Sequence, residues 1–187
     1  SVRRLRFAGD SLLVATDFGL VIYDVDREET RDTYSRFADL PAATSVNDAL
    51  VAPLADGRAG LWVATDAGLV NAPRNEGNLQ VATAWTQDPA FNGSAFSLGS
   101  LRGDVYVGGG PDTEKDLYRR LADGTYERQF FINNPILDIA SSSELLIAVD
   151  PSFAWARYAD GGGTRFATDP TVSSLNSAAI GSDGQVW

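Results

Sequence analysis

Apolar and polar residues alternate along most of this chain in short runs. The clearest run, LWVAT at 61–65, ends at the Asp-x-Gly triplet 66–68 and is followed by a second apolar run from Leu69. Alternation with a period of two is typical of a β-strand, and Gly in Asp-x-Gly supplies the backbone angles of a tight turn. The segment therefore predicts two antiparallel strands joined by a short hairpin.

The same pattern recurs, which makes the chain an array of repeats. Residues 12–20 repeat residues 61–69 with only two substitutions. Weaker copies begin at Val105, Leu145 and Val186, so the spacing between copies lies between 40 and 49 residues. A period of this length, with frequent glycine, proline and β-branched residues, favours four-stranded propeller blades over helical repeats.

The predicted fold class is all-β: a β-propeller, or a propeller segment, of four-stranded antiparallel blades, with four complete blades and the start of a fifth. The blades cover about 1–39, 45–88, 94–133 and 135–169, and the incomplete fifth covers 174–187. Their predicted strands are 2–7, 11–16, 20–24 and 31–37; 47–54, 60–65, 69–72 and 79–85; 96–101, 104–108, 116–121 and 126–132; 136–140, 144–149, 155–158 and 164–167; and 175–180. Because the last unit stops within its second strand, we expect a single propeller segment from a longer polypeptide.

Composition narrows the classes of function. The 187 residues include 25 acidic and 15 dispersed basic side chains, a formal net charge of −10 that argues against nucleic acid as a partner. Cysteine and histidine are absent, which excludes disulfides, thiolate metal sites, Cys nucleophiles and His-dependent triads. No apolar run approaches the roughly 20 residues of a membrane helix, so we expect no direct membrane insertion. The sequence predicts neither a metal nor a cofactor.

Residues 56–69, DGRAGLWVATDAGL, resemble the two-component regulator propeller repeat, and residues 182–187, SDGQVW, look like the start of another copy. The family pattern is an Asp-Gly turn, a Leu-Trp strand, Thr, and Gly-Leu opening the next strand. In that family the repeats build seven-bladed propellers, usually in the periplasmic sensor half of hybrid histidine kinases and often for carbohydrate signals, or in secreted and surface-anchored proteins. The resemblance implies a bacterial recognition or scaffolding propeller without catalysis, in the periplasm or at the cell surface.

Turns between the second and third strands of propeller blades open onto a face that often binds ligands, since loops carry much of protein function. Aromatic residues in or beside these turns, where repeat packing does not demand them, can stack on a sugar ring or anchor a protein; they include Phe153. For Asp17 and Asp66 the structural alternative is stronger, because Asp before x-Gly caps turn amides with its carboxylate. The candidate ligand-binding residues are Asp17, Phe18, Asp66, Asp112, Glu114, Asp150 and Trp155.

Trp62 and Trp187 occupy one position of the repeat, where other copies have Leu13, Tyr106 or Leu146. Interchange among large apolar side chains indicates packing between blades rather than ligand stacking. We therefore expect both tryptophans to be buried.

Three classes of function remain open. The first is a non-catalytic module that binds a protein or carbohydrate ligand and packs against further blades of the same or another chain. The second is a carbohydrate-active propeller enzyme, a glycosidase or polysaccharide lyase; a glycosidase needs two carboxylates about 5 to 10 Å apart. The third is a structural module of a cell-surface assembly. The first is the prediction that we carry forward, with no enzyme activity expected.

Overall fold

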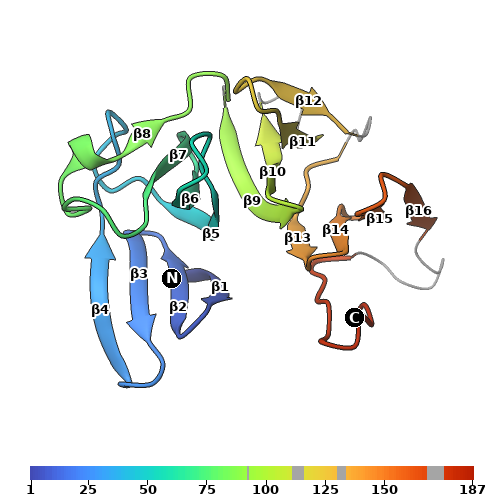
Figure 1. Cartoon of the computed structure of the whole chain (residues 1–187), viewed down its shortest axis with the longest axis horizontal. Coiled ribbons are helices and arrows are strands. Elements are labelled where there is room, and N and C mark those ends of the chain that lie inside the picture. Colours follow the sequence, from blue (N-terminus) through green and yellow to red (C-terminus); the bar gives the residue numbers. More distant parts are fainter. Residues whose placement is uncertain (92, 111–115, 130–133, 168–174) are drawn as a thin grey trace. The chain divides into compact units, whose positions relative to one another are not determined.

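The computed structural model describes residues 1–91, 93–110, 116–129, 134–167 and 175–187. Within these ranges sixteen strands form four antiparallel sheets of four strands each, as Figure 1 shows. Strands that follow one another in the chain are neighbours in their sheet. The chain is therefore all-β and built from four-stranded antiparallel units, as the repeat predicts.

The chain divides into two compact units, Ser1–Ala95 and Phe96–Trp187. Two sheets belong to the first unit: β1 (Val2–Ala8), β2 (Ser11–Thr16), β3 (Gly19–Asp24) and β4 (Glu29–Tyr34), then β5 (Val46–Pro53), β6 (Ala59–Thr65), β7 (Gly68–Pro73) and β8 (Thr86–Gln87). The other sheets comprise β9 (Ser94–Leu101), β10 (Asp104–Gly110), β11 (Asp116–Arg120) and β12 (Tyr126–Arg128), then β13 (Asp138–Ser141), β14 (Leu145–Val149), β15 (Phe153–Tyr158) and β16 (Gly163–Ala167).

Most predicted strands are confirmed, but the outer strand expected at 79–85 is wrong. A 3₁₀ helix, η1 (Ala82–Ala84), lies there, and the outer strand is the two-residue β8 that follows it. Trp85 explains the error, because it is buried against Tyr34 and Phe37 at ring-centroid distances of 5.6 and 4.9 Å. The apolar residues of this segment therefore serve packing rather than a strand.

The strand expected at 175–180 is also wrong in extent. Residues 175–187 contain one isolated bridge, between Ile180 and Val186. The turn predicted at 182–184 is present, with a hydrogen bond from the Gly184 amide to the carbonyl of Gly181 at 2.9 Å. Trp187 is 76% exposed, contrary to the burial expected for it, whereas Trp62 is 1% exposed as predicted.

The core of the first unit lies between its two sheets. Strand β6 is buried along nearly its whole length, because side chains on both of its faces are covered. Strand β1 differs, since Leu5 and Phe7 are 58% and 71% exposed. In the second unit, buried apolar residues from β9, β10, β11, β13 and β14 form a separate core cluster.

A buried carboxylate fixes β1 against β5. Asp48 of β5 is fully buried and accepts a hydrogen bond from Arg6 Nη2 at 2.7 Å, while Arg4 Nε lies 3.8 Å from the same carboxylate. The Ala49 amide donates to its other oxygen at 2.8 Å. A buried carboxylate is tolerable only when such partners replace water, so these contacts hold the two innermost strands of the first unit in one register.

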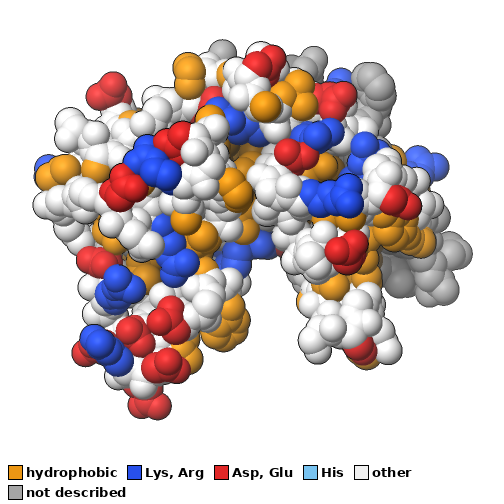
Figure 2. Space-filling model, in the orientation of Figure 1, with side chains coloured by type: hydrophobic (Ala, Val, Ile, Leu, Met, Phe, Trp, Pro, Cys, Tyr) orange, Lys and Arg blue, Asp and Glu red, His pale blue; other side chains and the backbone are white. Residues whose placement is uncertain are grey.

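Charged side chains of both signs gather at the tip of the β3–β4 hairpin, at the lower left of Figure 2. The Arg27 amide donates to Asp24 Oδ1 at 3.0 Å, and the Arg27 side chain is 75% exposed. Within the described residues no group of three or more Asp or Glu side chains is placed to hold a metal ion. No helix in the described ranges is long and apolar enough to cross a membrane.

Glycine is required at the start of β3. Gly19 has a φ of +139°, and a methyl group on its Cα would overlap the carbonyl oxygen of Tyr34 in β4. We expect Gly19→Ala to lower the free energy of unfolding by at least about 2 kcal/mol, from backbone strain together with overpacking. Denaturant titration measures this value.

The matched control is Gly57→Ala. Gly57 also has a positive φ, +81°, but nothing lies within 4 Å of the added methyl group. Only backbone strain remains in this variant, and we expect the free energy of unfolding to fall by about 1 kcal/mol. Equal losses in the two variants would contradict a steric role for the contact between Gly19 and Tyr34.

Candidate functional site

The two turns between the second and third strands of the first unit share one hydrogen-bond pattern. Thr16 Oγ1 donates to the Gly19 carbonyl at 2.7 Å and accepts from the Phe18 amide at 3.3 Å. Thr65 Oγ1 makes the equivalent bonds to Gly68 and Ala67, at 2.7 and 3.2 Å. Threonine therefore closes both turns, and the expectation that the aspartates cap them is wrong. The carboxylates of Asp17 and Asp66 bond elsewhere.

The carboxylates of Asp17 and Asp66 contact two residues that lie at equivalent irregularities of strand pairing. The pairing of β1 with β2 shifts register between Val2 and Arg4, and that of β5 with β6 shifts between Val46 and Asp48. Each shift leaves one extra residue on the innermost strand, as in a β-bulge, which turns that side chain out of the regular alternation. The extra residues are Arg3 and Asn47.

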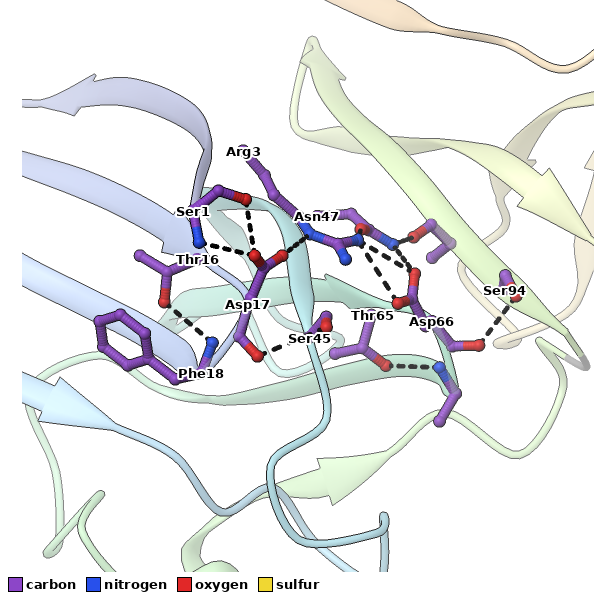
Figure 3. Close-up of polar contacts among 12 residues, drawn as sticks. Ser1, Arg3, Thr16, Asp17, Phe18, Ser45, Asn47, Thr65, Asp66 and Ser94 are labelled. Carbon is purple, nitrogen blue, oxygen red and sulfur yellow. Dashed lines mark hydrogen bonds and ion pairs between the residues drawn. The ribbon is translucent and has the colours of Figure 1, made fainter.

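Arg3 and Asn47 join the two turns into one chain of contacts, shown in Figure 3. Arg3 Nε donates to Asp17 Oδ1 at 2.5 Å, and Arg3 Nη1 donates to the side-chain oxygen of Asn47. Asn47 Nδ2 donates to Asp66 Oδ1 at 2.8 Å, and Arg3 Nη1 lies 3.4 Å from both oxygens of Asp66. We call Arg3, Asp17, Asn47 and Asp66 the inter-turn network.

Backbone carbonyls connect the inter-turn network to the start of the following repeat. Ser45 Oγ donates to the Asp17 carbonyl at 3.4 Å, and Ser94 Oγ donates to the Asp66 carbonyl at 2.8 Å. Asn47 Nδ2 also donates to the carbonyl of Ala95 at 2.8 Å. Each turn is thereby tied to the beginning of the following repeat.

Hydrogen bonds from Ser1 and Arg3 keep Asp17 ionised. Hydrogen bonds from the Ser1 amino group, the Ser1 hydroxyl and Arg3 Nε hold the pKa of Asp17 well below its usual value. The hydrogen bond to Asp17 in turn raises the pKa of Arg3. Both groups are therefore charged at every physiological pH, and neither is poised to transfer a proton.

Phe18 lies beside the inter-turn network, and its side chain is 55% exposed (Figure 3). The second turn has Ala67 at the same position, so the first turn alone of this pair carries an aromatic. A hydrophobic ring on a turn fixed by two side-chain hydrogen bonds loses little conformational entropy on binding. The surface formed by Phe18 and the inter-turn network is the candidate site, which we call the second-turn face.

The comparisons with known proteins concern the fold. No known family profile and no curated protein sequence matches this chain. PorZ, an essential bacterial surface component of the type-IX secretion system of Porphyromonas gingivalis, matches it with a TM-score of 0.71 and 20% identity, over 96% of this chain and 22% of that protein. The extracellular domain of the putative hybrid two-component system BT4673 from B. thetaiotaomicron matches with a TM-score of 0.66 and 17% identity, over 100% and 26%.

Virginiamycin B lyase from Staphylococcus aureus also matches, with a TM-score of 0.64 and 12% identity over 98% of this chain and 61% of the lyase. The fold is of the propeller type. This chain spans about a quarter of the length of PorZ and of the BT4673 domain. Since a surface component, an extracellular domain and a lyase share the fold, the fold alone does not select a function.

The other predicted ligand residues lie in the second unit. Asp150 is fully buried and accepts hydrogen bonds from the Ser152 and Phe153 amides, at 2.7 and 3.0 Å, and from Trp155 Nε1 at 2.9 Å. Trp155 is half-buried within β15. Asp112 and Glu114 lie outside the described residues.

The aromatic residues of β15 pair with a cation. The Arg165 guanidinium lies 4.4 Å from the ring centroid of Phe153 and 5.4 Å from that of Trp155. Cation–π contacts of this kind stabilise the strand pair β15–β16 locally. Asp150 therefore holds its turn together, and the two aromatic rings already have a partner in the fold.

Arg3, Asn47, Ser45 and Ser94 were missed from the sequence. The two serines carried a usable signal, because each lies 28 residues after the aspartate whose carbonyl it bonds. Arg3 and Asn47 carried none, since two unlike side chains occupy the same structural position.

Asn47→Ala tests the inter-turn network. The variant leaves the Ala95 carbonyl without its side-chain donor and removes the hydrogen bonds of Asn47 to Arg3 and Asp66, so we expect the free energy of unfolding to fall by about 1–3 kcal/mol. Asn75→Ala, at an exposed position of the same unit, should change it by less than about 0.5 kcal/mol. Similar denaturation midpoints for the two variants would contradict the structural role of Asn47.

Asp17 predicts a pH dependence. Its folded pKa lies below the unfolded value of about 3.9, so the ionised carboxylate stabilises the fold at neutral pH and loses this effect as the pH falls below about 5. Asp17→Asn should be less stable than the parent chain at pH 7, and the difference should shrink steadily toward pH 2. Unfolding curves at a series of pH values measure it, and a pH-independent difference would refute the assignment.

Proposed function

We propose that this chain is a non-catalytic recognition module of an extracytoplasmic bacterial protein, and that its second-turn face binds the ligand. The observation that carries the proposal is the inter-turn network, which fixes both predicted acidic residues in contacts with Arg3 and Asn47. A surface so arranged presents fixed charges and one exposed aromatic ring to a partner. Binding surfaces commonly combine an aromatic anchor with a polar surround.

The state of the acidic residues supports binding over catalysis. A glycosidase needs one carboxylic acid with a raised pKa that donates a proton near pH 7. Asp17 accepts a hydrogen bond from Arg3 and Asp66 accepts one from Asn47, so both carboxylates already serve as acceptors within the fold. This sequence also contains no histidine to take the role of a general acid or base.

The structural neighbours support a location outside the cytoplasm. PorZ is a bacterial surface component and the BT4673 structure is an extracellular domain. Together with the repeat motif at 56–69, the BT4673 likeness favours the sensing part of a two-component regulator as the specific form of the proposal. A protein or a carbohydrate is the expected ligand class.

The exposed apolar side chains of β1 support the expectation of further blades. Leu5 and Phe7 are more than half exposed, and Val2 is 61% exposed. An apolar sheet face in a propeller is normally covered by a neighbouring blade. Such a blade would come from the same or another chain.

A glycan array with a parallel assay for released reducing ends tests the proposal. We expect binding without turnover, and we expect Phe18→Ala to weaken it about tenfold, the effect of losing about 1.4 kcal/mol of contact. Phe7→Ala is the matched control, because Phe7 is also an exposed phenylalanine but lies outside the second-turn face, and it should leave binding unchanged. Release of reducing ends that disappears in Asp66→Asn would instead establish an enzyme.

A further inference from the structure

A pocket of about 470 Å³ opens at the margin of the interface between the two sheets of the first unit. Its floor is apolar and is formed by the buried side chains of Leu13, Ile22, Tyr34, Leu61 and Leu79. Its rim carries Arg31, Asp32, Arg74, Asn75, Asn78 and Gln80. Ser11, at the end of β2 away from Asp17, also lines the pocket, which therefore lies apart from the second-turn face.

Two arginines on the rim retain hydrogen-bonding capacity. Across the described ranges, the ion pair of Arg31 is a single 4.0 Å approach of its Nε to Asp32, which is too long for a hydrogen bond. Arg74 Nη2 donates to the Ala8 carbonyl at 3.1 Å. Each guanidinium has five N–H donors, so both arginines can bind an anion without giving up these contacts.

The remaining rim groups are held in place and suit hydroxyl groups. Gln80 Nε2 donates to Asp32 Oδ1 at 3.3 Å, and the Gln80 amide donates to Asn78 Oδ1 at 3.0 Å. Burial, and then the Asp32 carboxylate, raise the pKa of Tyr34 to about 12, so its hydroxyl keeps its proton. The rim therefore offers both hydrogen-bond donors and acceptors, and it carries two guanidinium groups and one carboxylate.

A second pocket lies at the equivalent position of the second unit, and there one arginine is paired with a carboxylate. In the second unit, Asp104, Tyr106 and Arg119 line a pocket of about 230 Å³ at the places that Ser11, Leu13 and Ile22 hold in the first. There Arg119 Nε donates to Asp104 Oδ2 at 2.8 Å. Both units thus have a hollow at this place, and of these two the larger has the volume that a small ligand needs.

We propose that the larger pocket binds a small carboxylate that carries several hydroxyl groups, such as a uronic acid. Its carboxylate lies on the guanidinium groups of Arg31 and Arg74, and its hydroxyl groups bond to Asp32 and the rim amides. Its carbon skeleton covers the apolar floor. The volume admits one or two such units, and a single negative charge matches the excess of one guanidinium over the Asp32 carboxylate. This ligand is additional to the partner of the second-turn face.

Isothermal titration of the whole chain with galacturonate, galactose and acetate tests the proposal. We expect galacturonate to bind at least tenfold more tightly than either of the other two, because it alone supplies both the charge and the hydroxyl groups. Arg31→Gln should weaken galacturonate binding at least tenfold. Arg27→Gln, which removes the same charge at the exposed β3–β4 tip, should leave it unchanged.

Each other outcome is decisive. No heat up to about 50 mM galacturonate, a limit set by the weakest affinities that titration detects, overturns the proposal. Equal binding of acetate, or equal losses in the Arg31 and Arg27 variants, overturns it as well.

Tighter binding of a galacturonate trimer than of the galacturonate monomer supports the site and identifies a polysaccharide end as the source of the ligand. Equal binding of the two identifies the free acid as the source. Loss of galacturonate binding in Phe18→Ala would assign the ligand to the second-turn face instead, so the two proposals fail separately.

Discussion

The structure depends on burial of the sheet faces. A four-stranded sheet of this length has two apolar faces and cannot bury either alone, so it is stable only against a neighbour. In the first unit the sheet β5–β8 meets this condition, and Leu61, Trp62 and Val63 of β6 are at most 2% exposed. The near-continuous apolar sequence of that strand, which first revealed the repeat, is a consequence of having cover on both sides.

Apolar packing between sheets has no preferred direction, whereas hydrogen bonds do. In the first unit, hydrogen bonds fix the turns at one end of the sheets. Thr16 and Thr65 close the turns, and Ser45 and Ser94, at the start of the following repeats, donate hydrogen bonds to the turn carbonyls. The turns are thus rigid where a ligand would meet them. Rigid turns on a packed scaffold are the usual basis of a binding surface, and the proposed recognition role rests on this arrangement.

The sequence predicted the parts of the fold that follow from periodicity. Strands β2, β3, β6 and β7 could be found because alternating apolar residues and Asp-x-Gly recur in both copies. The outer strand of the second sheet could not, since Trp85 is apolar in order to pack on Phe37 rather than to pair in a strand. Of the proposed site, Asp17 and Asp66 could be named from the sequence because Asp-x-Gly recurs in both copies. Arg3 and Asn47 could not, because they share a structural place without sharing a residue type.

The buried Asp48 has a consequence for how similar repeats find their proper neighbours. Since the blades share one apolar pattern, hydrophobic packing alone would accept several of them in the same place. A carboxylate without access to water accepts only a strand that brings arginines to it, as β1 does with Arg4 and Arg6. A neighbouring strand without arginines would leave the Asp48 carboxylate buried and unpaired, so this contact selects β1 among strands of similar apolar pattern.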